Sequence, residues 1–485
     1  MYFQICSTYF TGEVIMVKKF FFLVSAFLLL PLSAQVAIAP VFKDNMVLQR
    51  DAQVPVWGSA APGETVTVTF AGQTVTATAG SDGKWMLYLA PMSACKVNRT
   101  LTVSGKENTI TINNCLVGEV WLCSGQSNME MPMWTTNARW RATNGERDVV
   151  SGANPLIRIM TVRRAWGGVP QDEMPSPWQI LDTQNGMTFS AVAFYFGQEL
   201  FKALDVPIGL VVSAWGGTII EPWIPPQGYA SMPQFSQISQ MLAGEYRPRG
   251  NHQPATLFNR MIYPFVNFKF RGVIWYQGCS NLDDGVLYKD KMQALLNGWR
   301  EVFNDPEMPF YFVQLAPCGY SGSPYRLPVM WETQTAFAVA NENNHVGMAV
   351  INDAGDVGNI HPANKRVVGN RLARLALRYT YGHQEVKADS PLLTSWKVEN
   401  GRFILSFRNV ERWQGTPDHF EVSGSDGKWV KAQVEISGTQ LIISAPGVDE
   451  PVQMRYLWHQ ALSGVLFNEA GLPLSAFSIP AAARD

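Results

Sequence analysis

Hydrophobic and polar residues alternate one by one along much of residues 41–115. Val66, Val68 and Phe70 alternate with threonines, and the same alternation returns at residues 74–79. Successive side chains of a strand point to opposite faces, so this period predicts strands with one buried face. Glycine and aspartate residues between the runs suit tight turns, because they tolerate positive φ. The segment is therefore predicted to form a small antiparallel β-sandwich.

The pattern changes between residues 118 and 382, where short apolar runs alternate with helical stripes. The apolar runs lie at residues 208–212, 272–276, 310–315 and 346–351. Runs of this length without polar alternation are typical of buried parallel strands. Hydrophobic residues recur every three or four positions at residues 292–303, which predicts an amphipathic helix. This alternation predicts an α/β protein with a doubly wound parallel sheet, which binds ligands beyond the carboxyl ends of its strands.

Period two returns towards the C-terminus, where Phe403, Leu405 and Phe407 alternate with polar residues. This pattern predicts a second β-rich domain. We therefore expect three domains after a leader: an N-terminal β-sandwich at residues 36–115, an α/β domain at residues 116–388, and a C-terminal β-sandwich at residues 389–485.

The first 35 residues have the character of an export leader. Lys18 and Lys19 precede an apolar run at residues 20–30, and small residues up to Ala34 follow. This order is typical of a secretory signal peptide, and translation is expected to begin at Met16. The apolar run is too short to span a bilayer. We therefore expect an exported protein, periplasmic or extracellular, with no membrane span.

Composition and charge narrow the possible functions. A chain of 485 residues with 47% hydrophobic and 16% charged residues is not intrinsically disordered. Lys and Arg number 38 against 39 Asp and Glu, and the resulting net charge of -1 leaves no basic field to attract nucleic acid. No Cys-x-x-Cys or His-Glu-x-x-His motif occurs, so we expect neither a metal nor another cofactor.

The most informative string runs from Gly118 to Glu130. A predicted strand ends at Gly125, and Ser127 follows the sharp turn at the start of a predicted helix. This geometry lifts a hydroxyl above the sheet edge and directs helix N–H groups at an anionic intermediate. An ordinary helix N-cap has the same residue pattern. Ser127 is therefore a candidate nucleophile whose role depends on what else meets it.

Two further strand ends carry residues suited to an oxyanion hole. One is followed by Trp-Gly-Gly-Thr at residues 215–218, and the other by Gln-Gly-Cys-Ser-Asn at residues 277–281. A backbone N–H of the paired glycines, the amide of Asn281 and the N–H of Ser127 would form a hole with three donors. Taken singly, the glycines also fit a plain turn and Asn281 an Asx-turn.

A histidine follows the last predicted strand. His361 lies in a loop from which an imidazole can reach the same sheet edge. Its unperturbed pKa near 6.5 suits a general base at neutral pH. A single loop histidine is also common as a surface or capping residue. The presence of the other blocks favours a base for Ser127.

Together these blocks resemble those of the SGNH hydrolases, and specifically the sialate O-acetylesterase family of carbohydrate esterases. The family's four blocks correspond to Gly-Gln-Ser-Asn-Met at 125–129, Trp-Gly-Gly-Thr at 215–218, Trp-Tyr-Gln-Gly at 275–278 and His-Pro at 361–362. Strings at residues 46–50 and 471–474 extend the resemblance over nearly the whole mature chain. It implies an SGNH-hydrolase-like, flavodoxin-like sheet flanked by β-sandwich domains.

The resemblance also implies roles for single residues. Ser127 becomes the nucleophile and His361 the base. Ser127, Gly217 and Asn281 form the oxyanion hole, with Gly216 as a one-residue alternative to Gly217. Substrate binding is assigned to three residues in or near the blocks, Gln126, Gln277 and Trp223.

Two departures from the family pattern affect this assignment. Cys279 stands where family members usually have Glu after Trp-Tyr-Gln-Gly. Gly358 stands where the fuller pattern has Asp three residues before His. Asp356 is therefore the first candidate for the acid of a triad, Asp353 is the alternative, and a Ser-His dyad stays open.

The resemblance implies a secreted serine esterase that removes O-acetyl groups from sialic acid through an acetyl-enzyme intermediate. The expected partner is an O-acetylated sugar. An acetylesterase for xylan or another polysaccharide would use the same scaffold, because the catalytic blocks recognise the acetyl ester and not the sugar. A glycan-binding protein without activity is a third hypothesis, kept open by Cys279.

Overall fold

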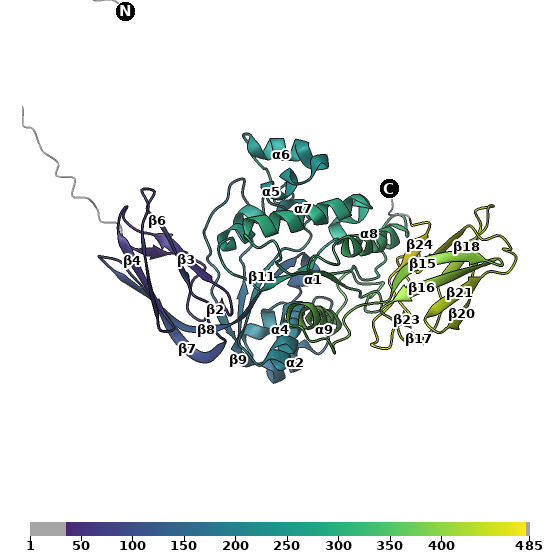
Figure 1. Cartoon of the computed structure of the whole chain (residues 1–485), viewed down its shortest axis with the longest axis horizontal. Coiled ribbons are helices and arrows are strands. Elements are labelled where there is room, and N and C mark those ends of the chain that lie inside the picture. The colour runs from purple at the N-terminus through teal and green to yellow at the C-terminus, as the bar shows by residue number, and fades with distance from the viewer. Residues whose placement is uncertain (1–34, 482–485) are drawn as a thin grey trace, which may run out of the picture. The chain divides into compact units, whose positions relative to one another are not determined.

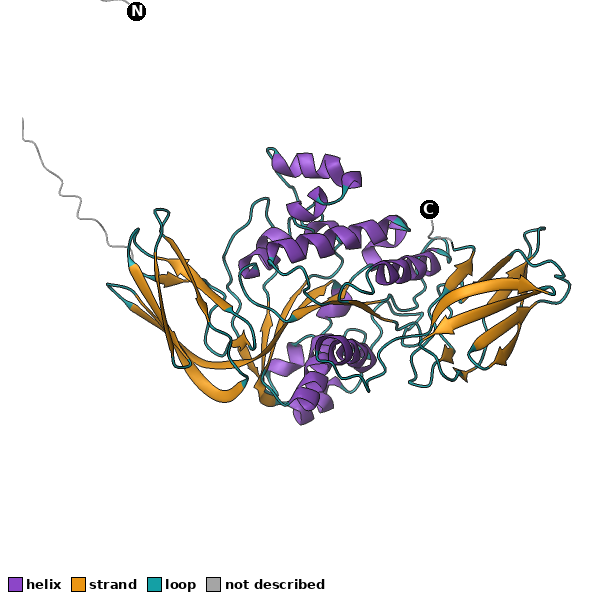
Figure 2. Cartoon of the chain, viewed as in Figure 1, coloured by secondary structure: helices purple, strands orange, loops and turns teal. Residues whose placement is uncertain are grey.

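The computed structural model describes residues 35–481, so the predicted leader lies outside the described residues. These residues belong to one compact unit. Strand-rich segments precede and follow a central sheet that has helices on two sides (Figure 1, Figure 2). Within the described range, no helix is long and apolar enough to cross a membrane.

Six N-terminal strands form two groups of antiparallel pairs, and a further one, β2, pairs parallel with β8. Strand β3 pairs with β1 and β6, while β4 pairs with β5 and β7. The predicted alternation appears as alternating burial in β4, where Val66, Val68 and Phe70 are buried. The strands are β1 (Ala37–Ile38), β2 (Val47–Gln49), β3 (Val54–Ser59), β4 (Thr65–Phe70), β5 (Gln73–Thr78), β6 (Lys84–Leu89) and β7 (Cys95–Ser104).

One long strand, β8 (Thr109–Gly125), connects this region to the central sheet. Its first half pairs antiparallel with β7, and its second half pairs parallel with β11 and β12. The domain boundary predicted between residues 115 and 116 therefore falls inside a continuous strand. The domain limits stay a prediction, but this strand makes a hinge at that point unfavourable, since its ladder hydrogen bonds would break.

The central sheet is mixed, with strand order β10-β9-β11-β8-β12-β13-β14. All neighbours from β9 to β14 are parallel, and only the edge strand β10 runs antiparallel to its neighbour. The predicted apolar runs become four of these strands. Besides β8 the sheet contains β9 (Asn154–Thr161), β10 (Gln179–Leu181), β11 (Ile208–Ala214), β12 (Gly272–Tyr276), β13 (Phe310–Val313) and β14 (Val346–Ala349).

Helices lie on two sides of this sheet, as Figure 1 shows, with α4 and α9 together on one side and α5, α7 and α8 on the other. The helices are α1 (Ser127–Glu130), α2 (Gly145–Gly152), α3 (Asn185–Thr188), α4 (Ala191–Leu204), α5 (Pro226–Ala230), α6 (Ser236–Ala243), α7 (Leu287–Val302), α8 (Arg326–Ala340) and α9 (Lys365–Leu375). Short 3₁₀ and π segments are η1 (Glu221–Trp223), η2 (Pro233–Phe235), η3 (Phe258–Ile262), η4 (Tyr263–Phe265), η5 (Cys279–Asp284) and η6 (Ala376–Thr380).

The C-terminal strands are antiparallel and contact the central region through buried polar groups. The Gln314 side chain donates to Ser475 Oγ at 2.8 Å, and Asn352 Nδ2 donates to the carbonyl of Leu474 at 2.8 Å. The strands are β15 (Leu392–Glu399), β16 (Arg402–Arg408), β17 (Gln414–Gly415), β18 (Phe420–Ser423), β19 (Trp429–Lys431), β20 (Gln433–Ser437), β21 (Gln440–Ser444), β22 (Gln453–Tyr456), β23 (Leu466–Phe467) and β24 (Phe477–Ile479).

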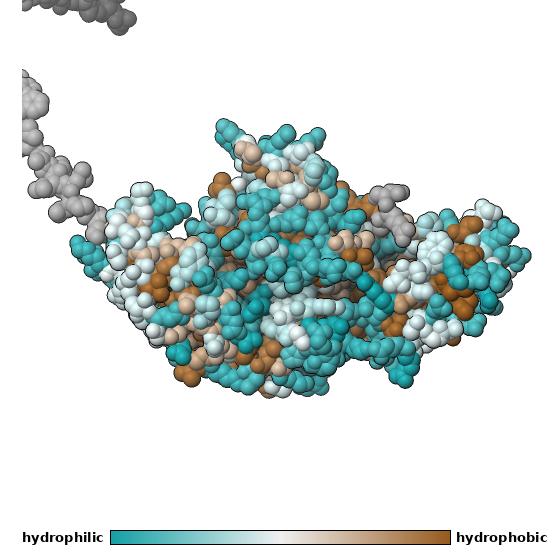
Figure 3. Space-filling model, in the orientation of Figure 1, coloured by the Kyte–Doolittle hydropathy of each residue, from teal (hydrophilic) through white to brown (hydrophobic). Residues whose placement is uncertain are grey.

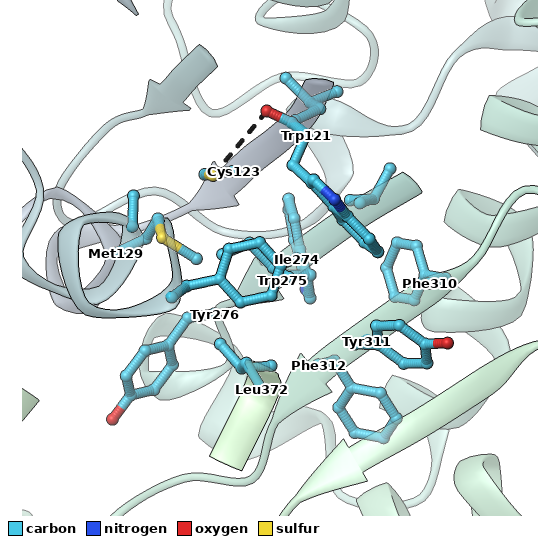
Figure 4. Close-up of a cluster of buried hydrophobic side chains, with 14 of the residues drawn as sticks. Trp121, Cys123, Met129, Ile274, Trp275, Tyr276, Phe310, Tyr311, Phe312 and Leu372 are labelled. Carbon is cyan, nitrogen blue, oxygen red and sulfur yellow. Dashed lines mark hydrogen bonds between the residues drawn. The ribbon is translucent and has the colours of Figure 1, made fainter. Parts of the chain in front are cut away.

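The core beneath the sheet edge is dense in aromatic side chains. Figure 4 shows Met129 of α1 among residues of β8, β12 and β13, including Trp121, Trp275 and Tyr311. All four are buried. The outer surface is different, since hydrophilic residues cover much of the face shown in Figure 3 and the hydrophobic patches are scattered. Burial of Met129 anchors the short helix α1, which begins with Ser127.

Candidate active site

The ends of three parallel strands meet where Ser127 begins α1. In the sheet register, Gly125 at the end of β8 lies beside Ala214 of β11 and Tyr276 of β12. Gly125 has φ +138°, and a Cβ there would lie 2.1 Å from the carbonyl oxygen of Tyr276. Only glycine fits this turn. The turn sends the chain out of the sheet and puts Ser127 above its carboxyl edge, as the sequence predicts.

The ring of His361 meets the hydroxyl of Ser127. His361 Nε2 lies 2.8 Å from Ser127 Oγ. The backbone N–H of His361 donates to Asn359 Oδ1 at 3.0 Å, and the ring packs edge-on against Trp140 with centroids 4.5 Å apart. A loop contact and an aromatic contact thus hold the imidazole at hydrogen-bond distance from the serine, which is the geometry of a nucleophile and its base.

A buried side-chain bridge links the serine helix to the histidine loop. Asn128, next to Ser127, donates through Nδ2 to the carbonyl of Ile360 at 2.9 Å. Its Oδ1 accepts a hydrogen bond from Lys365 Nζ at 2.5 Å. Lys365 is fully buried, and its ammonium lies 5.2 Å from the centroid of the Tyr276 ring. Asn128 therefore fixes the distance between the two loops, a role for Asn128 and Lys365 that the sequence motifs do not indicate.

The surroundings of His361 favour a neutral imidazole. Burial, and then the positive charge of Lys365, lower the pKa of His361 from 6.5 to about 4. Burial also lowers the pKa of Lys365 to about 7. An imidazole with so low a pKa is unprotonated at neutral pH and free to accept a proton.

Neither predicted aspartate contacts the ring of His361, so the assignment of Asp356 or Asp353 as the acid of a triad is wrong. Asp353 forms a bidentate ion pair with Arg371, whose Nη1 and Nη2 donate to Oδ1 at 2.5 Å and to Oδ2 at 2.7 Å. Asp356 accepts a hydrogen bond from the N–H of Gly358 at 2.9 Å, in a local turn. Among residues 35–481 no carboxylate bonds to the His361 ring, and the open alternative of a Ser-His dyad agrees with this geometry.

We expect Asp356→Asn to keep kcat within a few-fold of wild type, because its carboxylate serves only a turn. Asp353→Asn should behave alike in kcat but lower the free energy of unfolding by about 1 to 3 kcal/mol, since it weakens the charged pair with Arg371. Acetate release and urea unfolding of both variants measure these effects. A large loss of kcat in the Asp356 variant at unchanged stability would restore the triad.

The glycine pair after β11 lies against the nucleophile. A Cβ at Gly216 would lie 3.2 Å from Cβ of Ser127 and 3.1 Å from Oε2 of Glu130. The N–H of Gly216 already donates to Glu130 Oε2 at 2.9 Å. Gly217 has φ +78°, open space at its Cβ position, and an N–H with no partner among the described residues. Of the two glycines, Gly217 is therefore the one with a free donor.

Gly216→Ala is expected to lower kcat by about 10-fold. The new methyl group would lie 3.2 Å from Cβ of Ser127 and would force that side chain to move by a few tenths of an ångström, whereas a misplacement near 1 Å costs about 10²-fold. Gly244→Ala is a matched control, since the nearest atoms to its added Cβ lie 3.7 Å away. Equal kcat values for the two variants would contradict the close approach of this turn to the serine.

The prediction that Asn281 donates into the oxyanion hole is wrong. Its side chain is only 4% exposed. Both donors of its amide are taken, by Glu221 Oε2 at 3.1 Å and by Asp284 Oδ2 at 2.8 Å. Its Oδ1 accepts from the N–H of Ile220 at 2.9 Å. Asn281 thus connects the segment after β11 to η5 and has no hydrogen left for a ligand.

The structure also buries the three residues expected to bind substrate. Gln126 Oε1 accepts from the N–H of Gly278 at 3.0 Å, and Gln277 Nε2 donates to Asn281 Oδ1 at 2.7 Å. Trp223 is fully buried. These side chains hold the strand ends together, so the expectation that they contact substrate is wrong. Their position in or near the motif blocks suggested that they bind substrate. The sequence does not distinguish an amide side chain that binds a loop from one that binds a ligand.

A charged side chain that has no motif to mark it also supports the site. Glu130, at the end of α1, accepts from Gly216 N through Oε2 and from Arg164 Nε through Oε1 at 2.7 Å. This carboxylate ties α1 to the glycine turn and to the loop after β9. No group of three or more His, Cys, Asp and Glu side chains in the described range is placed to hold a metal ion.

A solved structure of a carbohydrate acetylesterase from Xanthomonas citri matches this chain with a TM-score of 0.82 and 30% identity, over 91% of this chain and 99% of that chain. The shared fold, together with a serine that faces a histidine, defines a carbohydrate esterase, a carboxylic ester hydrolase. The chain belongs to the family described as carbohydrate esterase, sialic acid-specific acetylesterase, whose model matches residues 117–378.

Curated relatives agree with this family. The chain is similar to the sialate O-acetylesterase of Mus musculus, with 30% identity over 86% of this chain and 88% of the relative. It is also similar to the sialate O-acetylesterase of Homo sapiens, with 29% identity over 87% of each. At 86 to 87% of this chain, these alignments extend beyond residues 117–378 into the flanking β-rich regions.

Proposed function

We propose that the protein is an exported serine esterase that removes O-acetyl groups from sialic acid, with Ser127 as nucleophile and His361 as base. The observation that carries this proposal is the 2.8 Å contact between Ser127 Oγ and His361 Nε2 at the carboxyl edge of the sheet. The curated names of the relatives support sialic acid as the substrate sugar.

We further propose that the central sheet is of the SGNH-hydrolase type, flanked by β-sandwich domains. From β11 to β14 the parallel strands lie in the order β11-β8-β12-β13-β14. Numbered along the chain, this is the order 2-1-3-4-5 of flavodoxin-like sheets, with β9 added at one edge. Ligands of such sheets bind where the strand order reverses, which here is the end of β8, next to Ser127.

The reaction follows from this pair. Ser127 Oγ attacks the acetyl carbonyl carbon while His361 Nε2 accepts the hydroxyl proton. The N–H groups of Ser127 and Gly217 stabilise the oxyanion. The bond to the sugar oxygen breaks as His361 returns the proton to that oxygen. Water, deprotonated by His361, then attacks the acetyl-enzyme, and acetate leaves as Ser127 regains its proton.

Two acetylated substrates separate the proposed sugar from its nearest alternative. Acetate release is measured with purified protein on O-acetylated sialic acid and, in parallel, on acetylated xylan. Release from sialic acid alone supports the proposal. Release from acetylated xylan alone would support Ser127 and His361 as the catalytic pair but would identify xylan as the substrate. Release from neither substrate favours the glycan-binding hypothesis.

Export rests on the pattern of residues 16–34, which lies outside the described structure. The test is expression with and without these residues, followed by N-terminal sequencing of the protein from the periplasm or medium. Export requires cleavage near Ala34. Retention of an uncleaved chain in the cytoplasm would contradict it.

A further inference from the structure

A pocket lined by arginines opens at the same sheet edge as Ser127. It follows β9, has a volume near 240 Å³, and its lining includes Arg163, Arg164 and Arg260 with a single acidic residue, Glu173. Strand β9 is parallel to β11, so its carboxyl end lies beside the end that carries the glycine pair. Three arginines among the lining residues suit a planar anion such as a carboxylate, because a guanidinium can bind it with two parallel hydrogen bonds.

The pocket is connected to the nucleophile by a short chain of contacts. Arg164 donates to Glu130, and Glu130 accepts from the N–H of Gly216 at 2.9 Å. The Cβ position of Gly216 lies 3.2 Å from Cβ of Ser127. The Arg164–Glu130 ion pair therefore joins the lining of the pocket directly to the helix that begins with Ser127.

The charges in the pocket are only partly balanced. Glu130 takes up the charge of Arg164 in an ion pair. Glu173 lies 3.5 Å from Arg260, but its side chain is 79% exposed, and such a contact contributes little in water. The guanidinium of Arg163 has no hydrogen-bond or ion-pair partner within the described part of the chain. Two arginines are thus available to an anionic ligand.

We propose that this pocket binds the carboxylate of an acidic sugar while Ser127 attacks an acetyl ester on the same sugar, with Arg163 and Arg260 as the ligating side chains. The inference rests on the proposed function, because sialic acid has a carboxylate that neutral acetylated sugars lack. It assigns the discrimination between acidic and neutral sugars to electrostatics in this pocket, separate from the Ser-His chemistry.

The test compares two substrates that differ only in charge: O-acetylated sialic acid and its C1 carboxamide, in which an amide replaces the carboxylate. Arg163→Gln and Arg260→Gln are each expected to raise KM for the acid by about 10- to 100-fold, the range for a hydrogen bond to a charged group. Their kcat should change little, and their kinetics on the carboxamide should match wild type. Arg412→Gln, at an exposed arginine of the C-terminal region, is the matched control.

A variant of the acidic residue should change KM in the opposite direction. Glu173→Gln removes the pocket's competing carboxylate, so KM for the acid should fall while the carboxamide is unaffected. Arg164 is not used as a test, since through Glu130 its loss would disturb the serine helix.

The outcomes separate this inference from the proposed function. If wild type hydrolyses acid and carboxamide equally well, and the arginine variants do the same, the pocket assignment is overturned while the sialate esterase stands. If wild type releases acetate from a neutral acetylated sugar and from neither sialic acid derivative, the proposed substrate fails and the inference fails with it. Equal KM increases on both substrates would mean a structural role for the arginines and would also overturn the inference.

Discussion

Replacement of Ser127 by alanine is expected to lower kcat on the order of 10⁴- to 10⁶-fold, the scale measured when the nucleophile of a serine hydrolase is removed. The reason is that no other hydroxyl lies at hydrogen-bond distance from His361 Nε2 in the described residues, so no substitute nucleophile has a base. Acetate release measures the loss.

The control is Ser236→Ala, at an exposed serine that begins α6. It should keep wild-type activity and should still be labelled by a fluorophosphonate, whereas the Ser127 variant should not be labelled. Both variants should melt at the wild-type temperature, because Ser127 Oγ contributes a single hydrogen bond. Wild-type turnover in the Ser127 variant would contradict the nucleophile assignment.

Replacement of His361 by glutamine should cause a loss of the same order, since glutamine keeps a polar side chain but accepts no proton. In the wild type, the pKa of His361 of about 4 sets the acid limb of kcat/KM. Activity requires the neutral ring, so kcat/KM should stay level above about pH 5 and fall as the pH drops through 4. An imidazole with its usual pKa of 6.5 would lose activity about 2.5 pH units higher. An acid limb near 6.5 would therefore contradict the burial argument.

The charge of Lys365 supplies a second test of this limb. With its pKa of about 7, Lys365 is positively charged at the pH where His361 titrates. Lys365→Met removes this charge, so the acid limb should move to higher pH. It should remain below 6.5, because burial, the larger cause of the shift, is unchanged. Lys202→Met, at an exposed lysine of α4, is the control and should not move the limb.

The Lys365 variant has a separate stability effect. It leaves Asn128 Oδ1 buried without its donor, which costs about 1 to 3 kcal/mol. The pH profile is therefore measured at a temperature where the variant is fully folded, as checked by circular dichroism. A loss of kcat at every pH with an unmoved limb would indicate that Lys365 only supports the loop.

Several elements of the fold follow from local patterns. Alternating residues in β4 and the apolar runs of β11 to β14 appear as strands close to their predicted limits. The predicted stripe at residues 292–303 lies within or beside α7 (Leu287–Val302). In β4 and α7 the spacing of hydrophobic residues shows the one face that is buried. The unbroken apolar runs of β11 to β13 become strands that are buried on both faces.

The positions of Ser127 and His361 also follow from the sequence. Ser127 stands directly after β8, His361 lies in the loop that follows β14, and strand ends of a parallel sheet meet at one edge. The choice of partners for the polar side chains does not follow. Asp353 bonds to Arg371, and Asn281 bonds to Glu221 and Asp284. Acid and amide residues have similar local sequences whether they bind a loop or a substrate, so their motif position misled the assignment.

The sequence alone thus determined which segments are strands and helices, which serine and which histidine reach the common sheet edge, and which family the chain resembles. Only the tertiary structure decided that no aspartate orients His361, that Asn128 and Lys365 support it, and that three arginines line one pocket after β9. The physical reason is that hydrophobic periodicity is a property of neighbours along the chain. Hydrogen bonds and ion pairs between residues such as Asn128 and Lys365, which lie far apart in sequence, depend on how the strands are ordered in the sheet.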